Sequence, residues 1–232
     1  MSSDLDLVLR IKDLVLNFYT YEGTVKALDR VQLFLRRGDT LGLVGETGCG
    51  KSVTAKSVMR LVESPGVIEG GQILFREKDP ATGDMIETDI LQLEEEEMLR
   101  IRGNKIGIVF QDPATYPNPV FRVGEQIAET ITLHQNLARE ALEIRIEELE
   151  ESLKAEDISS DRAEQIKEKI QEYKLQLDDP PKPDKKYKQK AAMRRAIEML
   201  KLVKMPDPEE IVNQYPHELS GGMRQRALIA MS

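Results

Sequence analysis

The fold of this sequence is decided by the stretch Gly45-Glu46-Thr47-Gly48-Cys49-Gly50-Lys51-Ser52, which matches the pattern G-x-x-x-x-G-K-[ST]. Its glycines let the loop wrap so that backbone N–H groups point inward at phosphate oxygens, and the helix that follows adds the positive end of its dipole. Lys51 is expected to reach the β- and γ-phosphates of a nucleotide, and the Ser52 hydroxyl to ligate Mg²⁺. These residues, with Val53, form the candidate nucleotide-binding set.

The neighbouring sequence supplies the context that such a loop requires. Thr40–Val44 is predicted to be a short apolar strand, and a helix is predicted from near Lys51 to about Val62. Further strands are predicted at Leu7–Phe18, around the alternating Val31, Leu33 and Leu35, at Ile73–Phe75 and at Ile106–Phe110. A strand, a loop and a helix with more strands around them indicate an α/β sheet, whereas a glycine-rich turn without a ligand leaves this context unexplained.

The middle of the chain has helical rather than strand periodicity. Two amphipathic repeats, separated by the polar link Asp157–Asp161, predict an antiparallel helical hairpin. Their apolar positions are Leu142, Ile146, Leu149 and Leu153, and then Ala163, Ile166, Ile170, Tyr173 and Leu177. The proline-rich segment Asp178–Asp184 ends the second helix, and another helix is predicted from Lys190 to about Val203. The basic residues of Lys182–Lys190 are interpreted as a solvated linker.

Composition narrows the possible partners and compartment. The formal net charge of −8 argues against binding to a phosphodiester backbone, so no nucleic-acid partner is expected. The single cysteine, Cys49, rules out an internal disulfide framework and fits a reducing compartment. No apolar run is long enough to span a bilayer and the N-terminus lacks a signal sequence, so any membrane contact is expected to come through a partner.

A second glycine motif lies near the end of the sequence, at Leu219–Arg226, which reads Leu-Ser-Gly-Gly-Met-Arg-Gln-Arg. Ser220 is a good N-cap, and Gly221 and Gly222 let a phosphate approach the backbone closely, although alone the motif could be an ordinary helix start. Together with the phosphate loop it resembles the ABC ATPase family and its LSGGQ-like signature. The resemblance implies that two subunits sandwich two ATP molecules, with the loop of one subunit facing Ser220–Gly222 of the other.

The stretch Ile106–Pro113 permits two interpretations. An apolar run that ends in Asp112 is similar to the Walker B strand of nucleotide hydrolases. However, Gln111 precedes the aspartate and Pro113 follows it, and in this order the stretch resembles the Q-loop of the ABC family. The second interpretation implies that Gln111 contacts Mg²⁺ and the attacking water, and senses a transmembrane partner.

Other stretches resemble one branch of the family, the D-type ATPase of oligopeptide and dipeptide importers. They are Met98–Gly103, Gln111–Phe121, Gly124–Ile127 and Tyr215–Glu218, within a resemblance that covers Leu7–His134 and Ala191–Ser232. The branch implies a P-loop α/β fold with an antiparallel β subdomain and a helical subdomain. It also implies ATP and Mg²⁺ as cofactors, a second ABC ATPase subunit in a homo- or heterodimer, transmembrane permease subunits, and a peripheral position on the cytoplasmic face of the membrane. Peptides, nickel and oligosaccharides all remain possible solutes.

The family places an aromatic residue that stacks on adenine upstream of the phosphate loop. Tyr21 aligns best with this position and Tyr19 is the alternative, while an exposed loop tyrosine is the interpretation without a function.

The resemblance also implies a division of the chain. Residues 1–134 hold the β region, the P-loop core and the Q-loop, residues 135–190 are an inserted hairpin with its linker, and residues 191–232 are a helical segment that ends in the signature. The insertion is either a surface decoration or a docking arm for a subunit or regulator.

Two competing functions follow from the same features. A coiled-coil insertion between the two glycine motifs is also where chromosome-maintenance ATPases of the SMC type carry theirs, but the short hairpin, the acidic balance and the absence of a Cys-x-x-Cys hook argue against that class. An ATP-binding remnant that does not hydrolyse ATP is the other alternative.

The first testable prediction concerns turnover. In the ABC family the Walker B aspartate, the catalytic glutamate and a switch histidine follow the signature, and residues 223–232 contain none of them, so the resemblance implies a fold that is incomplete at its C-terminal end. The 232-residue polypeptide alone is therefore expected to show no ATP turnover above background in a steady-state phosphate-release assay. Turnover that disappears in Lys51→Ala would contradict this.

Overall fold

The computed structural model describes residues 6–79, 82–110, 116–154 and 159–232. The chain divides at Ile106–Gly107 into two compact units, which are described in turn. Gln111, Asp112 and Pro113, the centre of the predicted Q-loop, lie outside the described residues.

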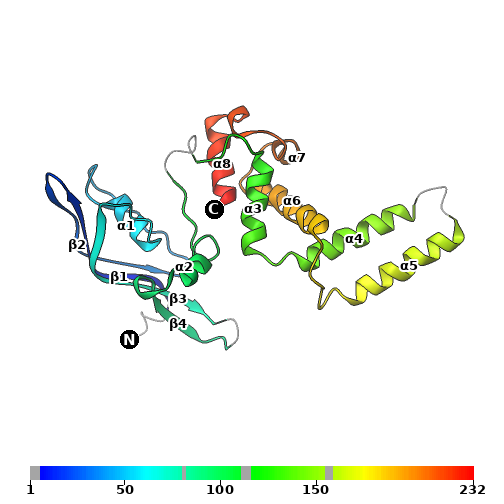
Figure 1. The fold of residues 1–232 in the computed structure, drawn as a ribbon, viewed down its shortest axis with the longest axis horizontal. Coiled ribbons are helices and arrows are strands. Elements are labelled where there is room, and N and C mark those ends of the chain that lie inside the picture. Colours follow the sequence, from blue (N-terminus) through cyan, green and yellow to red (C-terminus); the bar gives the residue numbers. More distant parts are fainter. Residues whose placement is uncertain (1–5, 80–81, 111–115, 155–158) are drawn as a thin grey trace. The chain divides into compact units, whose positions relative to one another are not determined.

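The first unit is built on an antiparallel sheet of four strands in the order β2-β1-β3-β4 (Figure 1). Its strands are β1 (Leu7–Thr20), β2 (Gly23–Arg36), β3 (Gly66–Lys78) and β4 (Met85–Asp89). The long β1 pairs with β2 on one side and with β3 on the other, which confirms the predicted strands at Leu7–Phe18 and Ile73–Phe75.

The apolar alternation of β2 produces the half-buried strand that it predicts. Val31, Leu33 and Leu35 are partly buried, whereas the residues between them are exposed. The core of the unit lies on the covered face of the sheet, where Leu14 and Leu16 of β1 and Ile73 of β3 are fully buried. This face is covered by α1 (Lys51–Val58), the short 3₁₀ helix η1 (Ile90–Gln92) and α2 (Glu95–Ile101).

Two predicted strands are wrong. Thr40–Val44 and Ile106–Phe110 are not strands, and the side chains of Leu41, Leu43 and Val44 are 47%, 48% and 99% exposed. A strand exists only through hydrogen bonds to a neighbour, and the described part of the chain places no strand beside either stretch. Apolar composition alone therefore did not decide their structure.

The helix after the phosphate loop is also shorter than predicted, because it ends at Val58 rather than near Val62. Arg60 adopts a left-handed conformation with φ of 51°, and its N–H donates to the carbonyl of Ser57 at 3.1 Å. The N–H of Leu61 donates to the carbonyl of Lys56 at 2.9 Å. These two bonds are the pattern that closes a helix, usually with glycine in the left-handed position.

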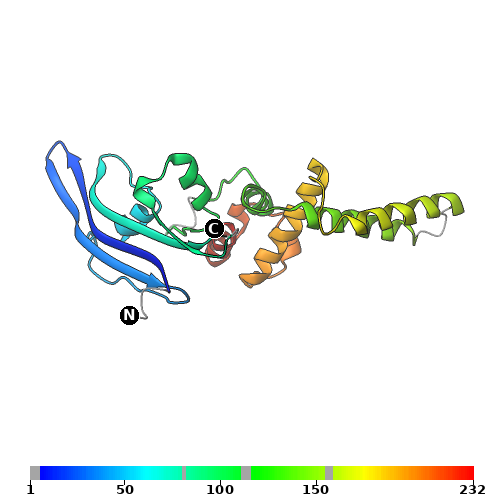
Figure 2. The ribbon, with the colours of Figure 1, turned by 90° about the horizontal axis from the view of Figure 1, so that it is seen from below.

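The second unit is helical (Figures 1 and 2). Its helices are α3 (Val123–His134), α4 (Ala138–Ser152), α5 (Ser160–Leu175), α6 (Lys185–Leu202), α7 (Pro208–Ile211) and α8 (Gly221–Met231), with the 3₁₀ helix η2 (Pro216–Glu218) before α8. Their common core includes Val123 and Ile127 of α3, Ala196 and Leu200 of α6, and Ala227 of α8.

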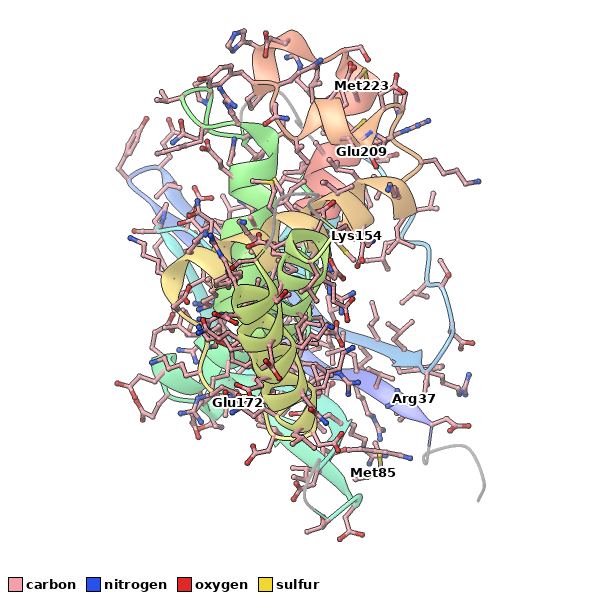
Figure 3. All side chains as sticks on the ribbon, turned by 90° about the vertical axis from the view of Figure 1, so that its right-hand side faces the viewer. Arg37, Met85, Lys154, Glu172, Glu209 and Met223 are labelled. Carbon is pink, nitrogen blue, oxygen red and sulfur yellow. The ribbon has the colours of Figure 1, made fainter. Side chains whose placement is uncertain are left out.

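The predicted helical hairpin is present as α4 and α5, which run side by side in both ribbon views (Figures 1 and 2). The two helices are packed together through Leu142, Ile146, Ile166 and Ile170, all positions of the predicted repeats. Glu172 on α5 is an example of an exposed polar side chain of the hairpin (Figure 3), whereas Leu175, the last residue of α5, is an exposed apolar one. The first turns of α4 belong to the common core of the unit instead, since Ala141 and Ile144 pack there. The proposed boundaries of the insertion, 135 and 190, stay a prediction.

Helix α6 begins at Lys185, five residues before the predicted start, so most of the basic segment is helix and not linker, although Lys185, Lys186 and Lys190 are exposed to solvent. The Asp184 side chain accepts the N–H of Tyr187 at 3.0 Å and caps the helix. Farther along α6, three basic residues face the acidic side of α4. Lys190 pairs with Glu148, Arg194 with Glu147, and Arg195 with Glu140 at 3.0 Å.

The start of α3 is tied to the segment before the signature. The N–H groups of Val123 and Gly124 donate to the carbonyls of Gln214 and Val212 at 2.9 and 3.0 Å. A Cβ on Gly124 would lie 2.7 Å from both the Cβ and the carbonyl oxygen of Val212. Glycine at this position therefore permits a backbone contact that any larger residue would displace.

Gly124→Ala is accordingly expected to destabilise the protein by about 1–3 kcal/mol through overpacking, which outweighs the gain of about 1 kcal/mol that alanine brings to a helix. Urea unfolding measures the difference. Gly222→Ala in α8 is the matched control, since a Cβ there meets nothing within 4 Å, and it is expected to be neutral or stabilising. Equal stability of Gly124→Ala and the wild type would contradict the packing argument.

Candidate nucleotide-binding site

The phosphate loop of the first unit ends in the N-terminus of α1. The first helical hydrogen bond runs from the N–H of Thr54 to the carbonyl of Gly50 at 2.8 Å. The N–H groups of Lys51, Ser52 and Val53 therefore precede the helical ladder, and Gly50 has no side chain with which to cap them. Such N–H groups, at the positive end of a helix, are donors suited to an anion.

Two glycines give the loop its path. Gly48 and Gly50 have φ of 88° and 92°, in the region that residues with a Cβ rarely adopt. A Cβ on Gly50 would lie 2.8 Å from the carbonyl oxygen of Ala27 and 2.8 Å from Leu28 Cδ2, both on β2. The loop thus rests directly on the sheet. The sequence analysis missed this contact with β2, because nothing local to the motif indicates which strand lies behind it.

The Lys51 amine lies within its own loop. Nζ donates to the carbonyl oxygens of Gly45 and Glu46, each at 2.7 Å, and lies 3.4 Å from the sulfur of Cys49. Phosphate oxygens are anionic and can replace these neutral carbonyls as stronger acceptors of the same ammonium protons. Glu46, Thr47, Gly48 and Cys49 are exposed, so the loop is open to a ligand.

The chemistry of the donors is compatible with Mg²⁺. Ser52 is exposed at the second position of α1, beside the N–H groups that an anion would use. A hydroxyl oxygen is a hard ligand, and Mg²⁺ in nucleotide sites is held by one or two protein oxygens together with substrate phosphates. Gln111, the other predicted ligand, lies outside the described residues, so its position stays a prediction.

The two candidate tyrosines differ in their surroundings. Tyr21 lies in the two-residue turn between β1 and β2, and its side chain is 99% exposed. The Tyr19 hydroxyl donates to Glu69 Oε1 at 2.7 Å, and this hydrogen bond raises the pKa of the phenol above its usual value. Tyr19 is therefore engaged with β3, whereas the ring of Tyr21 is available for stacking.

The second glycine motif begins α8 in the helical unit. The hydroxyl of Ser220 accepts the N–H of Met223 at 3.4 Å, as expected for an N-cap. Leu219 is buried and its carbonyl accepts a hydrogen bond from Arg224 Nε at 3.0 Å, which anchors the motif from below. Gly221 and Gly222 are exposed, and a Cβ on either would meet nothing within 4 Å. The backbone of the motif is therefore accessible to an anion.

The predicted site residues thus fall into separate groups. Gly45–Val53 lie together in the first unit, and Ser220–Gly222 lie together in the second. The segment that contains Gln111 is flanked by Phe110 and Tyr116, whose rings stack with centroids 4.2 Å apart.

The helical unit also has an apolar groove of about 320 Å³ between α3 and α6. Ala128, Leu133, Ala192 and Met193 provide its apolar lining, and Leu133 is 74% exposed. The rim is charged on both sides, with Glu125 and Glu129 on α3 and with Lys185 and Lys188 on α6.

Among the described residues, no helix is long and apolar enough to cross a membrane.

Comparison with known proteins gives one consistent result. The family described as ABC transporter matches residues 28–232. The oligopeptide transport ATP-binding protein OppD of Bacillus subtilis (strain 168) is 37% identical over 226 residues, which are 97% of this chain and 46% of that protein. The dipeptide transport ATP-binding protein DppD of Lactococcus lactis subsp. cremoris is 36% identical over 225 residues, 97% of this chain and 48% of that protein. The chain therefore spans about half the length of the curated relatives that it matches.

Among solved structures, the dimeric ABC transporter cassette MJ0796 superposes with a TM-score of 0.60 over 96% of this chain and 68% of that one, at 19% identity. This likeness shows the fold, which is that of the ABC ATPase cassettes and agrees with the predicted class. The family model matches residues 28–232, which is most of the chain. The chain therefore belongs to the ABC transporter family.

Proposed function

We propose that this chain binds ATP with Mg²⁺ as the nucleotide-binding subunit of an ABC importer, and that the imported solute is a peptide. The observation that carries the proposal is the phosphate loop of the first unit. The loop N–H groups before Thr54 have no partner within the helical ladder. The Lys51 amine donates to neutral carbonyls that phosphate oxygens can replace.

Within this proposal each residue of the site has a separate task. The loop N–H groups and Lys51 hold the β- and γ-phosphates, Ser52 and Gln111 hold Mg²⁺, and the ring of Tyr21 stacks on adenine. When held by these residues, Mg²⁺ would supply positive charge that offsets the charge of the phosphates. Gln111 would orient the attacking water.

Ser220, Gly221 and Gly222 would serve a different nucleotide, the one held by a second ABC ATPase subunit in a homo- or heterodimer. Their accessible backbone and the N-terminus of α8 suit that role. ATP binding would then close the dimer, because each nucleotide is contacted from both sides. The 232 residues alone bind nucleotide without turning it over in this proposal, since no Walker B aspartate or catalytic glutamate follows Gly222 within them.

The peptide solute is supported by the relatives, which are ATP-binding proteins of oligopeptide and dipeptide transport. The likeness to these proteins favours a transporter over a chromosome-maintenance ATPase, and the net charge of −8 disfavours a nucleic-acid partner. Nickel and oligosaccharides are the alternative solutes. We propose that permease subunits recruit the chain to the cytoplasmic face of the membrane, and that the groove between α3 and α6, with Leu133 exposed, is part of their contact surface.

An ATP-binding subunit without hydrolysis is the second candidate function, and the open phosphate loop supports it equally. The two candidates differ in the assembled transporter. Solute-stimulated phosphate release from a reconstituted complex that contains this chain supports the importer, and its absence despite ATP binding supports the second candidate.

Replacement of Lys51 tests nucleotide binding directly. Lys51→Ala removes charge-assisted hydrogen bonds to phosphate and is expected to weaken ATP binding by about tenfold to a hundredfold. A titration with a fluorescent ATP analogue in the presence of Mg²⁺ measures the change. Lys56→Ala is the matched control on the same helix, where the amine pairs with Glu63 at 2.8 Å, and it is expected to bind like the wild type. The same affinity in all three proteins would refute the proposed site.

The adenine contact is tested at the two tyrosines. Tyr21→Ala is expected to weaken ATP binding by about five- to a hundredfold, because a base stacked on an aromatic ring is stabilised by about 1–3 kcal/mol. Tyr21→Phe keeps the ring and should bind normally in the same titration. If Tyr19→Ala weakens binding and Tyr21→Ala does not, the stacking role belongs to Tyr19.

A further inference from the structure

Arg102, at the end of α2, closes the C-terminal end of the helix that follows the phosphate loop. Its Nε donates to the carbonyl oxygen of Met59 at 2.8 Å, and its Nη2 donates to the carbonyl oxygen of Arg60 at 3.4 Å. Met59 is the C-cap residue of α1. The Arg102 side chain is only 19% exposed, so these contacts are made in a mostly enclosed place where water competes weakly.

The guanidinium is held from its other side by a shared carboxylate. Glu95, at the start of α2, pairs with Arg102 Nη1 at 2.5 Å and with Arg60 Nη2 at 3.6 Å. Arg60 Nη1 also donates to the carbonyl oxygen of Leu93 at 2.6 Å. Arg60, Glu95 and Arg102 thus form one charged cluster, here called the α1 clamp, which joins the end of α1 to α2.

A cation at this end of a helix has two physical effects. The last carbonyls of a helix have no intrahelical partner, and they carry the negative end of the helix dipole. In the clamp, Arg102 donates to the carbonyl of the C-cap residue Met59, and its positive charge opposes the negative end of the dipole. Because α1 has eight residues, its two ends are only about 12 Å apart. Tilting the clamped end would therefore redirect the N–H groups of Lys51, Ser52 and Val53 at the other end.

The backbone of Arg102 leads toward the predicted Q-loop. It forms a bridge with Ile106, and the N–H of Gly103 donates to the carbonyl of Ile106 at 3.0 Å, with φ of 76° at Gly103. The chain leaves this tight turn on the way to Gln111. One residue thus holds the P-loop helix with its side chain and begins the segment to Gln111 with its backbone.

We propose that Arg102 is a positioning residue of the nucleotide site, acting through α1 by holding the phosphate-binding N–H groups in the direction that ATP requires. This role rests on the proposed binding of ATP at Gly45–Val53. Arg102 touches neither nucleotide nor Mg²⁺ in this proposal. A lysine cannot replace it fully, because the guanidinium donates to two carbonyls and a carboxylate from fixed positions on one plane.

The test uses the full 232-residue chain with Arg102→Ala and Arg102→Lys, titrated calorimetrically with MgATP. Arg102→Ala is expected to bind about tenfold more weakly, since a cation at a helix C-terminus and its hydrogen bonds account for an effect of that order, and Arg102→Lys should lie between it and the wild type. Added guanidinium ion at millimolar concentration should restore part of the affinity of Arg102→Ala. The amide ¹H–¹⁵N resonances of Gly48, Gly50 and Lys51 should shift in Arg102→Ala before any nucleotide is added.

Arg100→Ala is the matched control, because Arg100 is exposed on the same helix. It is expected to leave affinity and the loop resonances unchanged. Thermal unfolding without nucleotide shows at which temperatures every variant is fully folded. MgATP is titrated at such a temperature, so that a loss of stability is not mistaken for a loss of positioning. If Arg102→Ala binds MgATP like the wild type, or if its loop resonances do not move, the positioning role is overturned.

Glu95→Gln keeps the test decisive if Arg102→Ala does not fold. This variant changes a side chain that is 59% exposed and removes the carboxylate that orients both guanidinium groups, so about threefold weaker binding is expected. Unchanged binding in that case overturns the proposal. The proposed function is judged separately by the wild type and Lys51→Ala: if neither binds MgATP, both proposals fail, whereas wild-type binding that is insensitive to Arg102 and Glu95 rejects only the positioning role.

Discussion

A Cβ on Gly50 would stand 2.8 Å from the carbonyl oxygen of Ala27, so the loop before α1 can lie on β2 only if that residue is glycine. The other features of the candidate site depend on this close approach. With Gly50 in a left-handed conformation and without a capping side chain, α1 begins with open N–H groups, and Lys51 folds back over the loop carbonyls. The glycine at position 50 therefore determines both the backbone conformation of the loop and the N–H groups that it presents to a ligand.

The far end of α1 is governed by the opposite requirement. There the groups that need partners are carbonyls, and Arg102, a distant residue in the sequence, donates to the carbonyls of Met59 and Arg60. A short helix with an anion site at its N-terminus and cations at its C-terminus is stabilised at both ends by complementary charge. Because α1 spans only eight residues, its two ends are close enough for the positioning role proposed for Arg102.

The helical unit presents its own glycine motif by a different arrangement. Leu219 is buried, and its carbonyl accepts a hydrogen bond from Arg224. These two contacts fix the residue before Ser220–Gly222, whose backbone lies at the surface. The close contact of Gly124 with Val212 connects α3 to the segment that precedes this motif. The helical hairpin is attached at the other side of the unit through the first turns of α4, which combine apolar packing with ion pairs to α6.

Sequence reasoning succeeded where the relevant interactions lie within a few residues. The alternation of Val31, Leu33 and Leu35 predicts the half-buried face of β2, and the apolar repeats predict α4 and α5. Reasoning of this kind failed at Thr40–Val44 and Ile106–Phe110, which are apolar but are not strands among the described residues. A strand needs a neighbour that its own residues cannot provide.

The sequence by itself determined the two glycine motifs, because the N-cap of Ser220 and the turn of Gly48–Gly50 are made by bonds and torsions of the residues concerned. The tertiary structure contributed the contacts that fix the end of α1 and the start of α6. Arg60 ends α1 in a conformation that glycine usually takes, and Glu95 and Arg102 contact it there. Helix α6 extends back to Lys185, where Asp184 caps it and the Tyr187 hydroxyl donates to Glu148 of α4 at 3.0 Å. In both cases a local cap is joined by a contact between residues about forty positions apart, because hydrogen-bond partners brought together by folding add to local preference.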